Sequence, residues 1–262
     1  MNAASLTEQW WTQALSGHDP QGRSPLPEPG DTTVARLEAL LRAWAEGFAA
    51  RRDDVRSSTL ALGKRGLHVD EASGFLRALD DRLLHVDSAG LVTPLAARTK
   101  SAGGRYALIC KNGDGTSINL EYLIQLATAA ELVIGHGWPP GCLQVERGEF
   151  DLIGFRAPTS QDVVMAVEAK ARVRGSDSLE KLLKALLSIA SDPSAAVGTN
   201  AQNKYRELLL LVEAHPVVLW LVAAGARWAF DASLDGHGSL RLRPRDSIAY
   251  PAVVADAVAR LR

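Results

Sequence analysis

The 262-residue sequence has few cysteines and no marked excess of charge of either sign. Its two cysteines, Cys110 and Cys142, form neither a CxxC pair nor a disulfide framework, so we expect a reducing, cytoplasmic setting. The formal net charge is -1. That balance excludes a uniformly basic protein that coats nucleic acid, but it permits a local basic groove beside an acidic site.

The sequence also lacks a long uninterrupted apolar run. Its most hydrophobic region, "LLLLVEAHPVVLWLVAAGA", is interrupted by Glu213, His215 and Pro216. It therefore does not supply the roughly 20 consecutive apolar residues that a helix needs to cross a bilayer. The opening "MNAASLTEQWW" has neither the basic nor the apolar part of a signal peptide. We therefore expect no membrane partner and no export.

Several common catalytic motifs are absent from the sequence. The six histidines show no HxH or HExxH spacing, which disfavours zinc, and His136 in "GHGWPPG" is expected to be a loop residue. No Gly-Lys-Ser/Thr phosphate loop and no GxSxG nucleophile motif occurs. A nucleotide-binding loop and a serine hydrolase site are thus both disfavoured.

The first hundred residues are expected to be mainly helical. Residues 1–32 combine a short helix containing Trp10 and Trp11 with a linker rich in proline and glycine. From Thr33 the apolar residues recur at helical spacing, which predicts a helix. Residues 33–100 as a whole are predicted to form helices followed by a short strand pair, an arrangement that could be a winged-helix-like unit. Residues 101–262 are expected to form the main domain.

The main domain is predicted to alternate helices and strands. Thr116 or Ser117 is expected to cap a helix over "INLEYLIQLATAAELVI". Three strands, "CLQVE", "EFDLIGF" and "DVVMAVEAK", are separated by short turns that favour antiparallel hairpins. Two helices follow, the first with Asp177 and Glu180 at capping-box spacing, then a buried strand, "VVLWLVAAG", two further strand-like segments, and a closing helix over 252–262. The expected class is α/β.

Charged residues interrupt two of these apolar strands. Because strand side chains alternate, Glu168 and Lys170 should share one face, while Val163, Met165 and Val167 take the other. Hairpin geometry brings Asp151 opposite Ala166 or Glu168. Buried carboxylates need partners, and a hard divalent cation such as Mg²⁺ suits oxygen ligands. A metal held there would activate water for hydrolysis of a phosphodiester.

These residues resemble the PD-(D/E)XK nuclease superfamily, which includes restriction endonucleases and Holliday-junction resolvases. The resemblance covers about residues 117–225 and implies a restriction-endonuclease-like αβββαβ core with a mixed sheet. It implies that Asp151, Glu168, the Ala169 carbonyl and Glu121 bind Mg²⁺, for which Mn²⁺ could substitute. Phe150 replaces the usual proline, and Glu149 in "GEFDLIG" is a possible auxiliary residue.

The resemblance also implies that Lys170 contacts the attacking water and the scissile phosphate. A lysine or glutamine on the helix after the third strand often assists in this superfamily, and several residues here compete for that role. Basic, polar and aromatic groups beyond the site are expected to contact nucleic acid, namely Arg172, Arg174, Lys181, Lys184, Gln202, Lys204, Tyr205 and Arg206.

We therefore expect a Mg²⁺-dependent DNA endonuclease that works by direct attack of metal-activated water. Homodimerisation would suit duplex cleavage, although no interface signature is evident. Two alternatives stay open. One is a catalytically inactive nucleic-acid-binding protein of the same fold, and the other is a DNA-binding regulator that acts through residues 33–100. The choice between DNA and RNA and the biological pathway also stay open.

Overall fold

The computed structural model describes residues 32–63, 66–99 and 104–251. The predicted opening helix with Trp10 and Trp11, the linker after it and the closing helix over 252–262 lie outside the described residues. None of the helices within these ranges is both long and apolar enough to cross a bilayer.

The first part of the described chain joins two helices to two small sheets. The bounds of the elements are α2 (Thr32–Ala49), β1 (Leu60–Ala61), α3 (Val69–Asp80), β2 (Leu84–Val86), β3 (Leu91–Pro94), β5 (Tyr106–Ala107), β6 (Ile109–Asn112) and β7 (Gly115–Ile118). One sheet has the order β2-β3-β5 and the other β1-β7-β6. The expected helix followed by a strand pair is present as α3 and the antiparallel β2–β3 hairpin.

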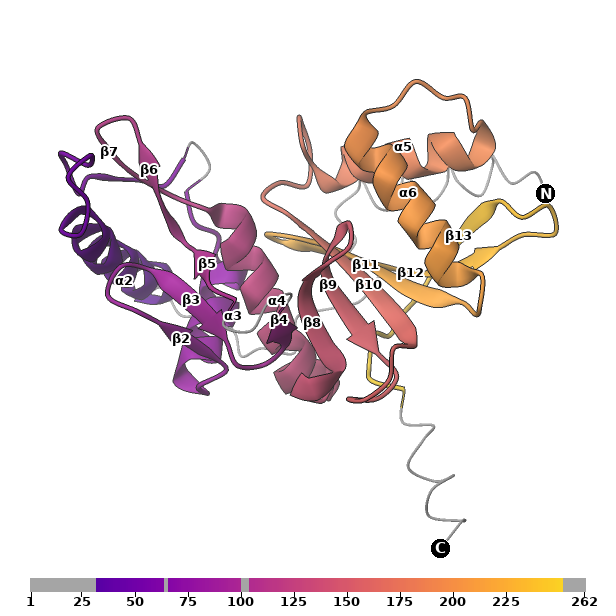
Figure 1. The fold of residues 1–262 in the computed structure, drawn as a ribbon, viewed down its shortest axis with the longest axis horizontal. Helices are drawn as coiled ribbons and strands as arrows, with labels where there is room; N and C mark the ends of the chain where they lie inside the picture. The colour runs from indigo at the N-terminus through magenta and orange to yellow at the C-terminus, as the bar shows by residue number, and fades with distance from the viewer. Residues whose placement is uncertain (1–31, 64–65, 100–103, 252–262) are drawn as a thin grey trace, which may run out of the picture.

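Strand pairing runs across residue 100, where the sequence suggested a domain boundary. Strand β5 extends the β2–β3 hairpin, and β7 pairs with β1, so residues 106–118 complete sheets begun earlier in the chain. In the other direction, the short strand β4 (Arg98–Thr99) pairs with β8 of the main sheet. Figure 1 shows β4 standing between the two parts of the molecule.

A seven-stranded mixed sheet forms the main part of the molecule, with the order β13-β12-β11-β10-β9-β8-β4. Its remaining elements are α4 (Leu120–His136), the 3-10 turn η1 (Pro140–Cys142), β8 (Leu143–Arg147), β9 (Phe150–Phe155), β10 (Val163–Lys170), α5 (Leu179–Ser191), α6 (Thr199–Val212), β11 (Val217–Ala223), β12 (Ala226–Leu234) and β13 (Leu240–Pro244). Strands β8, β9 and β10 are antiparallel as predicted, and β11 is parallel to β10. The α/β class and the mixed sheet are confirmed.

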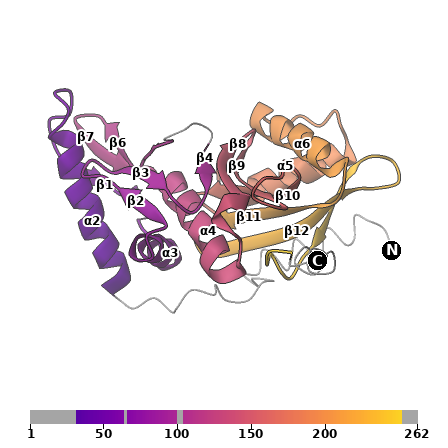
Figure 2. The same ribbon diagram turned by 60° about the horizontal axis from the view of Figure 1, so that its bottom comes forward.

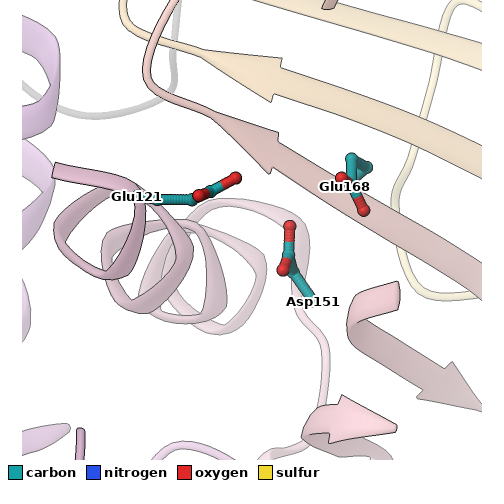
Figure 3. Close-up of side chains that lie close together, drawn as sticks. All are labelled: Glu121, Asp151 and Glu168. Atoms are coloured by element: carbon teal, nitrogen blue, oxygen red, sulfur yellow. The ribbon is translucent and has the colours of Figure 1, made fainter. Parts of the chain in front are cut away.

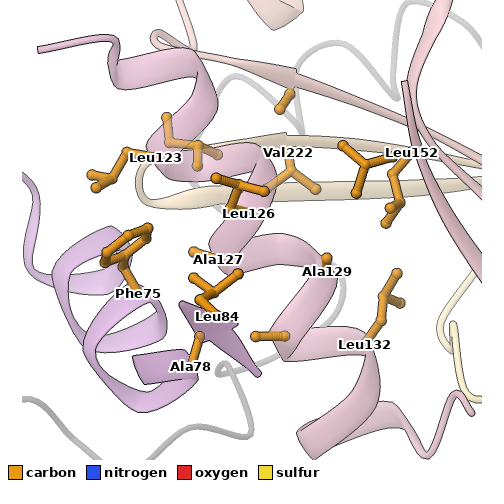
Figure 4. Packing of buried hydrophobic residues seen from close by; sticks show 14 of the residues in the cluster. Phe75, Ala78, Leu84, Leu123, Leu126, Ala127, Ala129, Leu132, Leu152 and Val222 are labelled. Atoms are coloured by element: carbon orange, nitrogen blue, oxygen red, sulfur yellow. The ribbon is translucent and has the colours of Figure 1, made fainter. Parts of the chain in front are cut away.

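Helices cover both faces of this sheet. Helix α4 packs on one face and α5 and α6 pack on the other (Figure 2), and each face has its own apolar cluster. Leu123, Leu126 and Leu132 of α4 lie between α3 and the sheet (Figure 4), where Phe75 and Leu152 complete the packing. Helix α4 is buried around most of its circumference because it has a neighbour on both sides.

Every residue of β10 is buried, because both faces of the strand are covered. A register shift between Val163 and Met165 interrupts the alternation of side chains. Val163 packs in the α5–α6 cluster, whereas Met165 and Val167 pack in the α4 cluster. The prediction that Val163 shares a face with Met165 and Val167 is therefore wrong, since one irregular step reverses its direction.

Two helix starts differ from the sequence prediction. The Asn119 side chain caps α4 by accepting from the Tyr122 N–H, while Thr116 and Ser117 lie in β7. Helix α5 is capped by Ser178 rather than by Asp177. Asparagine and serine are both strong cap residues, so propensity alone does not decide between neighbouring candidates.

An ion pair connects the turn after β9 to the segment that leads into β11. His215 Nε2 contacts an oxygen of Asp162, which also accepts from Arg156. The hydrogen bond to Asp162 raises the pKa of His215 above its ordinary value, and Arg156, followed by His215, lowers the pKa of Asp162. The pair is therefore charged between the ordinary pKa values of the two groups, about 4 and about 6.5.

We expect His215→Gln to lower the free energy of unfolding by less than about 1 kcal/mol at pH 5.5, because the pair is partly exposed. Because the pKa of His215 is higher in the folded protein than in the unfolded protein, its ion pair stabilises the fold fully at pH values below the unfolded-state pKa. This contribution is lost as the pH rises through the folded-state pKa. Urea titrations of both proteins at pH 5.5 and 8.5 test this. An equal difference at the two pH values would show that charge plays no part.

Candidate metal centre

Three carboxylates from three elements converge beside the main sheet. Glu121 lies in the first turn of α4, Asp151 in β9 and Glu168 in β10. One oxygen from each lies within 4.8 Å of the others. Figure 3 shows Glu121 and Asp151 directed toward the same space beside Glu168. The convergence expected from the sequence is thus present in the structure.

Strand register explains how Asp151 reaches this place. Val167 pairs with Leu152, so one further step of the antiparallel ladder puts Asp151 opposite Glu168, one of the two predicted partners. The backbone N–H of Ala169 donates to Asp151 Oδ2 at 2.7 Å. On the α4 side, Gln125 Nε2 donates to the Asp151 carbonyl at 2.6 Å, which ties the strand to the helix that carries Glu121.

Two buried lysines hold the carboxylates. Lys170 Nζ lies 2.6 Å from Glu121 Oε1 and 3.0 Å from Glu168 Oε1. Lys204 Nζ, which comes from α6, lies 2.7 Å from Glu168 Oε2 and also donates to the Glu149 carbonyl. Glu168 is only 1% exposed, so these two ammonium groups compensate a charge that solvent cannot reach.

The electrostatics leave Asp151 the least compensated of the three acids. Burial raises the pKa of Asp151 well above its ordinary value, and the neighbouring Glu168 raises it further. The Ala169 N–H and the two lysines act in the opposite direction but do not cancel this rise. Burial alone would lower the pKa of Lys170, but Glu168 and Glu121 raise it above its ordinary value, so this lysine stays protonated.

The donor set suits a hard divalent cation. Three carboxylates face two ammonium groups, so the cluster carries a net negative charge when all five groups are ionised. Oxygen ligands of this kind are those that Mg²⁺ and Mn²⁺ bind in proteins. The residues present therefore fit a metal ion. The predicted contribution of the Ala169 carbonyl stays a prediction, since only the N–H of Ala169 has a defined contact with the cluster.

The predicted nucleic-acid-binding residues differ in how far they are exposed. Lys204 and Tyr205 are buried, and Lys204 is engaged with Glu168, so neither presents a surface to a ligand. Gln202 is half-buried and donates to the Val197 carbonyl at 3.4 Å. The exposed members are Arg172, Arg174, Lys181, Lys184 and Arg206. Arg174 and Lys184 contact Glu180, and a role in binding nucleic acid stays a prediction for the exposed group.

Two contacts of the site were not predicted from the sequence. Lys204 was one of several lysines on helices after the third strand, and only tertiary packing selects it as the partner of Glu168. Asp177, expected at a helix cap, instead lies with Oδ1 3.6 Å from Lys170 Nζ, in a left-handed conformation with φ 51°. Glu149, the possible auxiliary residue, is exposed, and its N–H donates to the Glu207 carboxylate.

His136 also differs from its predicted environment. It is the last residue of α4 rather than a loop residue, and its ring packs edge-on against Trp220 at a centroid distance of 5.9 Å. Its Nε2 lies 3.9 Å from Glu131, which forms a pair with Arg227 at 2.8 Å. His136 thus belongs to a structural network around the end of α4.

Comparison with known proteins gives no relative. No protein-family model matches the chain, no curated protein matches it in sequence, and no solved structure matches it. Any proposal about the function of this protein therefore depends on the geometry of the site itself.

We expect Mg²⁺ or Mn²⁺ to raise the midpoint of thermal unfolding of the wild-type protein. A ligand that binds only the folded state stabilises it by about 2.7 kcal/mol at 100 times its dissociation constant. Asp151→Asn should lose most of this rise. In EDTA the variant should be at least as stable as the wild type, because it removes one of three neighbouring negative charges.

Asp54→Asn is the matched control, since Asp54 is a surface carboxylate paired with Arg52 and Lys111. Differential scanning calorimetry with and without metal gives the unfolding midpoints of Asp151→Asn, Asp54→Asn and the wild type. A metal-dependent rise that survives in Asp151→Asn would show that the ion binds elsewhere.

Proposed function

We propose that this protein is a Mg²⁺-dependent endonuclease that hydrolyses phosphodiester bonds of DNA. The observation that carries the proposal is the convergence of the Glu121, Asp151 and Glu168 carboxylates within 4.8 Å, with Lys170 Nζ 2.6 Å from Glu121 and 3.0 Å from Glu168. Acidic side chains rarely enter buried strands unless a partner or a function keeps them there. An oxygen-rich cluster with adjacent ammonium groups suits metal-assisted phosphoryl chemistry.

The order of elements supports the same proposal. Helix α4, strands β8, β9 and β10, helices α5 and α6, and strand β11 follow one another in the order αβββααβ. This is the αβββαβ order expected of the PD-(D/E)XK core with one additional helix before the last strand. Strand β11 lies parallel to β10 on the far side from β9. We propose that this segment is a restriction-endonuclease-like core, with Asp151 on its second strand and Glu168 and Lys170 on its third.

The chemistry assigned to each residue follows from its surroundings. A divalent cation, when bound, would polarise a phosphoryl oxygen and lower the pKa of water. Glu121, Asp151 and Glu168 would hold it. Lys170 stays protonated between Glu121 and Glu168, so it is placed to orient a water and to stabilise the negative charge that develops on the phosphoryl group. Lys204 would hold the Glu168 carboxylate in a fixed orientation.

The test is cleavage of plasmid, linear duplex, branched and single-stranded DNA with Mg²⁺, Mn²⁺ or EDTA. We expect activity with either metal and none with EDTA. Lys170→Met should lower the cleavage rate about 100-fold to 1000-fold, the range for removing one group that stabilises transition-state charge. Asp151→Asn should reduce it at least as much, because it removes a ligand.

Lys111→Met is the matched control, because Lys111 is an exposed lysine on β6 that pairs with Asp54 at 3.1 Å. This variant should cleave at the wild-type rate. Equal cleavage by the wild type, Lys170→Met and Asp151→Asn would mean that a contaminant cuts the DNA. Metal-independent binding of DNA without cleavage would favour the non-catalytic alternative.

A further inference from the structure

Two arginines meet on one aromatic ring near the edge of the main sheet. Arg98 lies on the edge strand β4, and Arg147 ends β8. The guanidinium carbon of Arg98 lies 4.2 Å from the ring centroid of Phe155, and that of Arg147 lies 4.8 Å from it. We call Arg98 and Arg147 the arginine pair. Two positive charges are thus neighbours on a ring that is itself fully buried.

The arginine pair has donors without partners. The Nε and Nη2 atoms of Arg98 and the Nη1 atom of Arg147 are inaccessible to solvent, and they have no hydrogen-bond partner among the described residues. Within the same ranges neither guanidinium forms an ion pair within 4.0 Å. Buried polar groups are nearly always hydrogen-bonded, so three orphaned donors on two adjacent cations indicate a missing acceptor.

The Glu207 carboxylate does not supply that acceptor. Arg147 acts on the Glu207 carboxylate of α6, where it opposes the rise in the pKa of Glu207 that burial causes. The Glu207 carboxylate, however, accepts from the Glu149 N–H, and no hydrogen bond joins it to either arginine. Arg98 and Arg147 are half-buried overall, unlike the buried Lys204 and Tyr205, so their guanidinium groups reach the surface. Their planar arrays of donors suit the oxygens of a phosphate.

The arginine pair lies on the same face of the sheet as the Glu168 carboxylate. Arg98 pairs with Gln144, Gln144 with Ile153, and Ile153 with Ala166, so these four residues form one row across the strands. Ile153 and Ala166 pack toward α5 and α6, and Glu168, two residues beyond Ala166, points the same way. Arg147 pairs with Phe150, the residue before Asp151.

Lysine and arginine thus alternate with aromatic rings along this face. Lys204 Nζ lies 5.3 Å from the centroid of Phe150 and 2.7 Å from Glu168, while the arginine pair and Phe155 continue the series toward β4. Figure 1 shows β10, β9, β8 and β4 as successive strands along this path.

We propose that the arginine pair is an anion site that binds a backbone phosphate of the nucleic-acid strand held at the carboxylate cluster. This inference depends on the proposed function for its ligand, and it deepens that proposal by naming the side of the cluster along which the strand runs. The site would position the strand rather than read its sequence, because phosphate contacts carry no base information.

The test measures binding of a short fluorescently labelled duplex over a range of salt concentrations, with Ca²⁺ in place of Mg²⁺. Arg98→Met and Arg147→Met should each weaken binding about tenfold and lower the slope of log Kd against log salt by about 1, the change for one lost phosphate contact. Arg36→Met, which removes the same charge from an arginine paired with Asp80, should leave the slope unchanged.

Thermal unfolding of the same variants separates binding from folding. Methionine keeps much of the apolar contact with Phe155 and removes donors that lack partners, so both variants should unfold no earlier than the wild type. Earlier unfolding with an unchanged slope would make the arginine pair structural and overturn the proposal. An equal loss of slope in Arg36→Met would also overturn it, since the effect would then be one of net charge.

Inorganic phosphate and pyrophosphate distinguish a strand phosphate from a small anion. Neither should raise the unfolding midpoint of the wild type by as much as the duplex does, and the reverse order would overturn the assignment to nucleic acid. The salt-dependence test of the arginine pair and the cleavage assay of the proposed function can fail independently. Cleavage with an unchanged salt slope rejects the arginine pair alone, whereas arginine-dependent binding without cleavage rejects the nuclease activity alone.

Discussion

The structure depends on how three carboxylates and two ammonium groups are accommodated at the junction of β9, β10, α4 and α6. Glu168 is almost fully buried and is held from two sides by Lys170 and Lys204. Removal of either lysine would leave a buried charge with one partner fewer, which is strongly unfavourable. Among the described residues, the Asp151 carboxylate accepts from the Ala169 N–H and is otherwise compensated by the charges of Lys204 and Lys170, which do not offset its burial beside Glu168. A further cation would therefore stabilise the cluster.

The sequence predicts much of this arrangement for simple geometric reasons. Side chains alternate along a strand, so Glu168 and Lys170 must share a face, and a short hairpin brings Asp151 opposite the same segment. The order of helices and strands follows from apolar periodicity. Glu121 could be assigned because it opens the helix that precedes the three strands.

Other features depend on tertiary packing and are not evident in the sequence. The register shift after Val163 follows no turn residue, and it reverses one side chain in an otherwise regular strand. Nothing in the sequence distinguishes Lys204 from the other lysines on helices. Only the packing of α6 on the sheet buries it beside Glu168. The pairing of Arg98 with the main sheet joins a residue of the first part of the chain to the second, so local patterns could not indicate the arginine pair.

The most direct measurement of the central claim is a crystal structure of the protein soaked in Mn²⁺, with anomalous scattering used to locate the ion. We predict a manganese peak in contact with the Asp151 and Glu168 carboxylates, with Glu121 on the same ion. A peak at another place, or carboxylates that remain closed on Lys170 at saturating Mn²⁺ with no ion between them, would contradict the account.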